Sequence, residues 1–149
     1  MTLYKCKYFD IRELVSPQVY NKYGAEFCWK FFDELLLQDL DTIREYHGSI
    51  TINNWLYGGK NTQCGLRCNM DPLVKSKRTI YCSGHVLARA FDLHSSNIKK
   101  LYEDIEKLFN EGKLLAVRRM ESSESTKYKW CHIDSFQTSD STKLEIFKG

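Results

Sequence analysis

Apolar residues recur with the spacing of an amphipathic helix in three segments of the chain. The first segment follows Ser16 and Pro17, a residue pair typical of a helix N-cap and the first helical position. Glycines follow the apolar repeats, and glycine commonly ends a helix. The pattern therefore predicts helices from Pro17 to Gly24, from about Glu26 to Tyr46, and from a cap at Ser95 or Ser96 to Gly112.

Other segments alternate apolar and polar residues or are rich in β-branched and aromatic residues, which is typical of strands. The predicted strands run from Ser49 to about Trp55, Ala88 to His94, Leu114 to Met120, Lys127 to Asp134 and Lys143 to Phe147. Residues 122–126 are expected to form the turn of a hairpin. Helices dominate the first part of the chain and strands the second, so the predicted class is α+β, with N-terminal helices packed on a mostly antiparallel sheet.

The length of 149 residues suits one domain, and no repeat or Gly/Ser linker divides the chain. We therefore expect a single domain over residues 1–149. Residues 57–81 lack a periodic pattern and contain several glycines, an Asp-Pro pair and several lysines. Long irregular segments of compact domains often carry function, so this segment is predicted to be a functional loop.

A net charge of +3 is too small to indicate nucleic-acid binding, and no apolar run reaches the length of a membrane span. The N-terminus lacks the apolar core of a signal peptide, so we expect synthesis in the cytoplasm. The six cysteines are accordingly expected to be free thiols. Cys82 and Cys131 are predicted to be buried apolar neighbours, and Cys64 and Cys68 lack the second pair of a four-cysteine zinc site.

Three residues carry the candidate chemistry. His85 and Asp92 lie seven residues apart, and His132 follows near the C-terminus. Two imidazoles and one carboxylate suit a catalytic zinc site, in which three protein ligands leave the fourth position to water. Because residues two apart share one face of a strand, Asp134 is expected beside His132. His94 shares a face with Asp92, but we expect it to be an exposed histidine at the strand end.

This arrangement resembles a known family. The pattern Ser-x-His at residues 83–85, Ala-x-Asp at 90–92 and His-x-Asp at 132–134 is similar to the zinc D-Ala-D-Ala carboxypeptidases and L-alanyl-D-glutamate endopeptidases, which include bacteriophage endolysins. Further segments resemble the opening, central strand and arginine loop of phage-encoded members: Tyr8–Pro17, Ile50–Trp55, Gly58-Gly59 and Thr62–Arg67. The resemblance spans roughly Tyr8 to Phe136 and implies the Hedgehog-type zinc peptidase fold.

The resemblance also implies residue roles. His85, Asp92 and His132 would bind zinc, which polarises the scissile amide and lowers the pKa of its bound water from 15.7 toward about 7. Arg67 matches an arginine that binds a substrate carboxylate. Ser83 matches a serine that hydrogen-bonds substrate or ligand. The implied substrates are peptidoglycan stem peptides, cut by a carboxypeptidase or an endopeptidase at the bacterial cell wall, after release or as part of a virion. Asp134 is expected to orient a ligand or to shape the site from behind the ligands.

One departure from the family concerns the general base. Many members carry an Asp or Glu three residues before the last histidine, where this chain has Lys129. In phage relatives a glutamate on the preceding strand takes this role, and Glu121 occupies that place. Glu124 is the second candidate, at the predicted turn. The alternative is a catalytically inactive zinc-binding virion, tail or cell-wall-binding protein, with other phage virion proteins as partners. A scaffold without metal is a third hypothesis.

Overall fold

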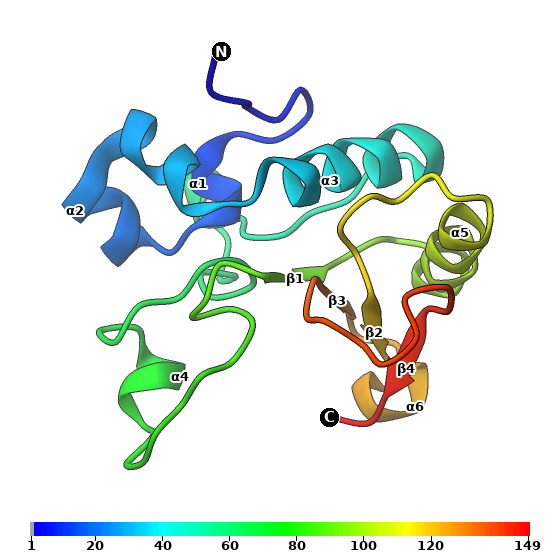
Figure 1. Ribbon diagram of the computed structural model, residues 1–149. Helices are drawn as coiled ribbons and strands as arrows, with labels where there is room; N and C mark the ends of the chain where they lie inside the picture. Colours follow the sequence, from blue (N-terminus) through cyan, green and yellow to red (C-terminus); the bar gives the residue numbers. More distant parts are fainter. Residues whose placement is uncertain (1) are drawn as a thin grey trace.

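The computed structural model describes residues 2–149 and shows an α+β architecture built on one four-stranded sheet (Figure 1). The strands are β1 (Ala90–Leu93), β2 (Arg119–Glu121), β3 (Cys131–Asp134) and β4 (Glu145–Phe147). Their order is β1-β3-β2-β4. Strand β3 is antiparallel to both of its neighbours, and β4 is parallel to β2. The predicted α+β class is therefore confirmed, and the sheet is mixed, with two antiparallel pairings and one parallel pairing.

The described chain also contains helices and two short 3-10 turns. They are α1 (Ile11–Leu14), α2 (Pro17–Cys28), α3 (Glu34–His47), α4 (Pro72–Lys75), α5 (Ile98–Asn110) and α6 (Ser123–Thr126), with the 3-10 turns η1 (Trp29–Phe31) and η2 (Trp55–Tyr57). As predicted, Ser16 caps α2, and its side chain accepts the N–H of Val19. The expected end at Gly24 is instead a kink inside α2, where φ is 75°. Within the described chain, no helix combines the length and the apolar character that a membrane span requires.

The predicted helix from Glu26 to Tyr46 is wrong, because the chain changes direction in its middle. Phe32 is extended, and the Asp33 carboxylate accepts the N–H groups of Leu35 and Leu36 at 2.7 and 3.4 Å. An aspartate in this position starts a new helix instead of continuing the old one, because it satisfies backbone donors at a helix N-terminus. Helix α3 therefore begins at Glu34.

The expected strand at Leu114–Met120 is mostly absent, for a similar reason. The buried carboxylate of Asp39, on α3, accepts the N–H groups of Leu115, Ala116 and Val117 at 2.6, 2.7 and 2.8 Å. These donors are no longer available to a sheet, so β2 begins only at Arg119.

Three further boundaries differ from the sequence pattern. The strand expected at residues 49–55 is reduced to one antiparallel bridge between Thr51 and His94. Asn97, not a serine, caps α5. Lys127 and Tyr128 both have φ 54°, so β3 begins only at residue 131, and the expected hairpin turn is helix α6. Strands β2 and β3 nevertheless pair as the predicted hairpin.

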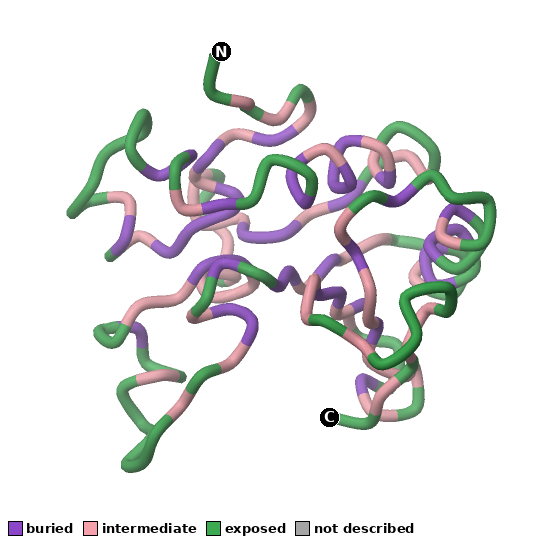
Figure 2. Tube along the Cα trace, viewed as in Figure 1, coloured by how far each residue is buried: buried purple, intermediate pink, exposed green. Residues whose placement is uncertain are grey.

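The hydrophobic core lies between the sheet and the helices α3 and α5, where the buried stretches of these elements face one another (Figure 2). Leu36, Leu40 and Ile43 fill it from α3. From β1, Phe91 and Leu93 are fully buried in it. Since side chains alternate along a strand, Asp92 faces the opposite side of the sheet. The core thereby fixes the face on which the candidate site lies.

Candidate metal centre

A tight turn before β1 positions His85. Within this turn, Arg89 N–H donates to the carbonyl of Gly84, and Ala88 adopts a left-handed conformation with φ 56°. The strand expected from Ala88 therefore starts two residues later. His85 is only 4% exposed, and its Nδ1 lies 2.9 Å from the carbonyl oxygen of Gly65. Because a carbonyl only accepts, Nδ1 carries the proton and Nε2 is left with its lone pair.

Glycine at position 65 makes this contact possible. A Cβ at this position would collide with the carbonyl of Leu14, so a larger residue would push the loop away from α1. The N–H of Leu66 also donates to the carbonyl of Leu14, at 2.8 Å. The loop that orients His85 is thus held by the N-terminal helices.

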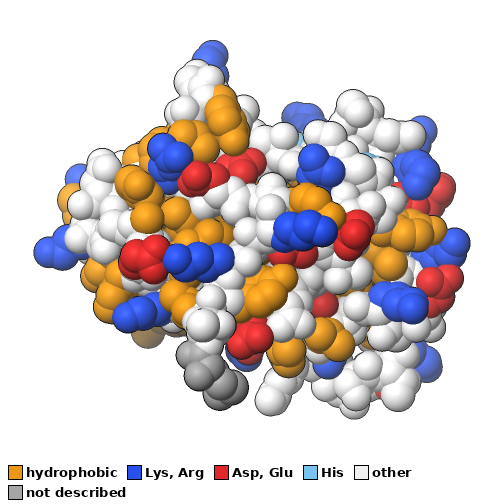
Figure 3. Space-filling view, turned by 90° about the horizontal axis from the view of Figure 1, so that it is seen from above, with side chains coloured by type: hydrophobic (Ala, Val, Ile, Leu, Met, Phe, Trp, Pro, Cys, Tyr) orange, Lys and Arg blue, Asp and Glu red, His pale blue; other side chains and the backbone are white. Residues whose placement is uncertain are grey.

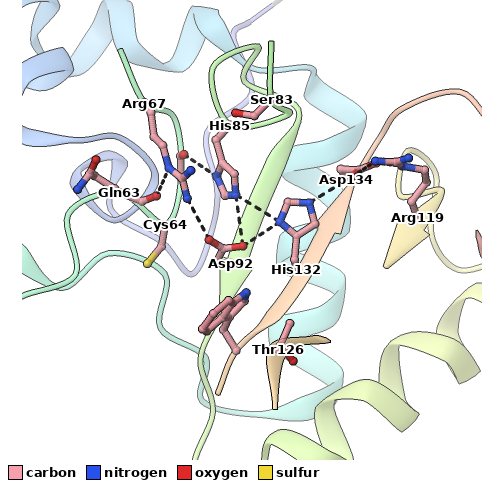
Figure 4. Close-up of polar contacts among 12 residues, drawn as sticks. Gln63, Cys64, Arg67, Ser83, His85, Asp92, Arg119, Thr126, His132 and Asp134 are labelled. Atoms are coloured by element: carbon pink, nitrogen blue, oxygen red, sulfur yellow. Dashed lines mark hydrogen bonds and ion pairs between the residues drawn. The ribbon is translucent and has the colours of Figure 1, made fainter. Parts of the chain in front are cut away.

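Strands β1 and β3 bring the other two residues together. Asp92 and His132 are direct antiparallel partners, and His132 Nδ1 lies 2.8 Å from Asp92 Oδ1. His85 Nε2 lies 3.3 Å from each of these atoms (Figure 4). One ligand atom from each side chain therefore points to a common centre, and the cluster could hold a metal ion.

The spacing of the three atoms fits a small divalent ion. Tetrahedral zinc with ligand distances of about 2.0–2.2 Å separates neighbouring ligand atoms by roughly 3.3–3.5 Å. Both separations from His85 Nε2, at 3.3 Å, match this value. The 2.8 Å between His132 and Asp92 is shorter and is the length of a hydrogen bond, in which a proton joins the two side chains.

The electrostatics show where that proton resides. Burial alone would lower the pKa of His132, but its contacts with Asp134 and Asp92 outweigh burial and raise the pKa to about 9. Burial would raise the pKa of Asp92, whereas its hydrogen bonds with His132 and His85 hold the pKa well below its usual range. The contacts with the two carboxylates therefore favour the protonated form of His132. A cation that binds here must displace this proton.

Asp134 holds the imidazole of His132 from the other side. Its Oδ2 lies 3.3 Å from His132 Nε2, and the carboxylate accepts two hydrogen bonds of 2.9 Å from Arg119. Burial would raise the pKa of Asp134, but His132 and Arg119 lower it, so the carboxylate stays ionised. The geometry is that expected of a group orienting a ligand. Sequence reasoning missed Arg119, although the register of β2 and β3 places it opposite Asp134.

Arg67 lies next to the cluster, in the wall of a pocket. Its Nε donates to the carbonyl of Gln63 at 2.5 Å, and its Nη2 lies 3.3 Å from Asp92 Oδ2 (Figure 4). The pocket has a volume of about 340 Å³, and Asp92, Trp130 and Leu73 also line it. Arg67 and one member of the candidate cluster, Asp92, thus line the same pocket.

Two neighbours of the site differ from expectation. His94 is half-buried instead of exposed, because the loop that carries Cys64 packs over it, with Nε2 3.4 Å from Cys64 Sγ. Cys82 is exposed, since it lies in the projecting loop before the turn of His85. Cys131 is fully buried, as predicted, and all six cysteines are free thiols.

Ser83 and the candidate bases lie at the edge of the site. The Ser83 hydroxyl accepts the N–H of Val86 at 3.4 Å and so supports the turn of His85; its contact with substrate stays a prediction. Glu121 is the residue after Met120, which pairs with Ile133, so the same register places Glu121 opposite His132. Burial raises the pKa of Glu121, and the charges of His132 and His85 partly offset this rise. Glu124 and Lys129 are exposed on and beside α6.

Comparison with known proteins identifies no relative: no family model matches the chain, and no curated protein or solved structure matches it significantly.

Proposed function

We propose that the protein is a zinc-dependent peptidase that hydrolyses amide bonds in peptidoglycan stem peptides at the bacterial cell wall. The observation that carries this proposal is the convergence of His85 Nε2, Asp92 Oδ1 and His132 Nδ1 on one centre beside a pocket. Two imidazoles and a carboxylate at this spacing favour zinc over magnesium or calcium, which prefer oxygen ligands. The resemblance of the motifs to the phage-encoded carboxypeptidases and endopeptidases supports the substrate class.

The residues around the cluster have separate tasks. A zinc ion held by His85, Asp92 and His132 would supply Lewis-acid chemistry, polarising the scissile carbonyl and acidifying a water molecule. Asp134 and Arg119 keep the imidazole of His132 in its binding orientation. Among residues 2–149, no acceptor bonds Nη1 of Arg67, so this side of the guanidinium is available to a substrate carboxylate in the pocket.

Glu121 is the residue we assign as general base. It shares the face of the sheet that carries His132, by the register of β2 and β3. Partial burial makes its carboxylate a stronger base than an exposed glutamate, since it raises the pKa. Glu121 would take a proton from the attacking water and return it to the departing amine, so that it ends the cycle ionised again.

The test is hydrolysis of a soluble stem peptide by the zinc-loaded protein, with amine release as the readout. Glu121→Gln should lower kcat by about 10²–10⁴-fold, the usual contribution of a general base, and should leave the zinc content unchanged. Glu124→Gln removes an exposed glutamate nearby and serves as the matched control, with unchanged kcat. Absence of turnover by the zinc-loaded wild type on all stem-peptide bonds would contradict the proposal.

One observation favours a second candidate function. Lys129 occupies the sequence position of the family's usual base, its side chain is exposed, and its backbone N–H donates to the carbonyl of Thr126. If Glu121 does not act as base, the same cluster would serve a zinc-binding protein without activity, as a component of a virion or a cell-wall-binding protein. That candidate predicts stoichiometric zinc without any turnover.

A further inference from the structure

A projecting arm lies beside the pocket of the metal cluster. Residues 68–82, here called the basic arm, leave the body of the protein with α4 and return before the turn of His85 (Figure 1). Most residues from 72 to 80 are exposed, and Ile80 is 90% exposed (Figure 2). The arm is held to the preceding loop because Leu73 N–H donates to Gln63 Oε1 at 2.8 Å, and within the arm Cys68 N–H donates to Asp71 Oδ2 at 2.6 Å. Leu73 itself lines the pocket.

The charge of the protein is concentrated in this region. The basic arm, residues 68–82, contains three cations and one anion, Asp71, which gives a net charge of +2. The whole chain has +3, so all the other residues together carry only +1. On the face seen in Figure 3, by contrast, basic and acidic side chains lie side by side.

Among the described residues, no acidic side chain pairs with a cation of the arm. Lys75, Lys77 and Arg78 are exposed, and within residues 2–149 none of them forms an ion pair. Asp71 is buried and accepts a backbone N–H, so its charge does not neutralise them from the surface. The exposed arm also carries the apolar side chains of Met70 and Ile80. An exposed surface with free cations and apolar groups fits a partner that is anionic but not uniformly charged.

We infer that the basic arm docks the protein on the carboxylates of peptidoglycan, the polymer that holds the scissile peptide, and so delivers neighbouring stem peptides to the pocket. This inference rests on the proposed function for the identity of the polymer. Stem peptides repeat along a glycan strand and carry carboxylates, which complement the row of free cations. A single exposed ion pair contributes little free energy to binding. Several contacts to one polymer bind more strongly together, because each contact raises the effective concentration of the next.

The test compares two triple variants of equal charge change. The arm variant carries Lys75→Gln, Lys77→Gln and Arg78→Gln; the control carries Lys22→Gln, Lys99→Gln and Lys113→Gln, which are exposed lysines elsewhere. Co-sedimentation with purified sacculi at low salt should show about tenfold weaker binding for the arm variant and no change for the control. The difference should disappear at high salt, because screening weakens exposed charge contacts.

Turnover separates this inference from the proposed function. The arm variant should cleave a soluble stem peptide at the wild-type kcat/KM and sacculi more slowly. Asp92→Asn should lose turnover and still bind sacculi through the arm, so absence of hydrolysis in the wild type would count against the peptidase and not against docking. Equal binding of arm and control variants to sacculi would overturn the inference. The inference would also be overturned if the arm variant bound vesicles of anionic lipid more weakly than wild type but bound sacculi equally well.

Discussion

Two clusters in this protein contain the same types of side chain, histidine and carboxylate, but arrange them differently. His47, at the end of α3, is 4% exposed, with Nδ1 2.7 Å from Asp104 Oδ2 and Nε2 2.7 Å from Ser95 Oγ. Both of its nitrogens are therefore engaged by separate protein groups, and it joins α3 to α5 and the end of β1.

In the second cluster each histidine keeps one nitrogen for a shared centre. The carbonyl of Gly65 orients His85 through Nδ1, and Asp134 orients His132 through Nε2. The remaining nitrogens converge on Asp92. A histidine with two different partners stabilises a fold, whereas histidines with one orienting partner each and a common centre form a site for a cation.

The largest effect is expected for the pH dependence of zinc affinity, which should come from the His132 cluster and not from the His47 cluster. His132 has a pKa of about 9 without metal, so binding releases its proton at neutral pH. Affinity for zinc should rise roughly tenfold per pH unit below pH 9, or about a hundredfold from pH 6 to pH 8, and level off above the pKa. Competition titration with a chromophoric chelator measures this slope. An affinity independent of pH would show that His132 is not a ligand.

The next largest effect on zinc affinity is expected when the charge that orients His132 is removed. Asp134→Asn should weaken zinc binding by about 10–100-fold, because the imidazole loses its ionised partner and the bidentate contact of that partner with Arg119 is lost. Asp104→Asn makes the same change in the His47 cluster and should leave the zinc affinity unaltered. Both variants are compared by the same chelator competition, and equal losses would remove the distinction between the clusters.

The smallest effect is expected for substitution of His47, which should change stability but not zinc binding. His47→Gln should lower the free energy of unfolding by about 1 kcal/mol, since glutamine replaces one of the two hydrogen bonds of the imidazole. The bound metal should remain. Urea denaturation of the zinc-loaded protein, with zinc content determined on the same sample, checks both statements; loss of zinc in this variant would show that the two clusters are coupled.

The sequence was sufficient for features that depend on local patterns. The sequence pattern placed Asp92 and His132 each on a predicted strand, and the sheet pairs these two residues directly. The serine-proline pair predicted the start of α2. The helical and strand periodicities together predicted the α+β class.

Features that depend on partners far apart in the chain could not be predicted. Asp39 takes the backbone donors of a segment about 76–78 residues away and so removes most of an expected strand. Asp104 lies 57 residues after His47, and no local pattern indicates that the two meet. Arg119 was missed because its role appears only when the register of β2 and β3 is known. These contacts decide which polar groups are already satisfied, and hence which remain for chemistry.

Metal analysis of the purified, dialysed protein tests the central claim most directly. Wild type and His47→Gln should each retain one zinc per chain, and His132→Ala should retain none, because it loses one of three ligands. Circular dichroism of the same samples would show that His132→Ala is folded. Wild-type protein without stoichiometric metal after zinc is supplied, or His132→Ala with a full zinc complement, would contradict the account.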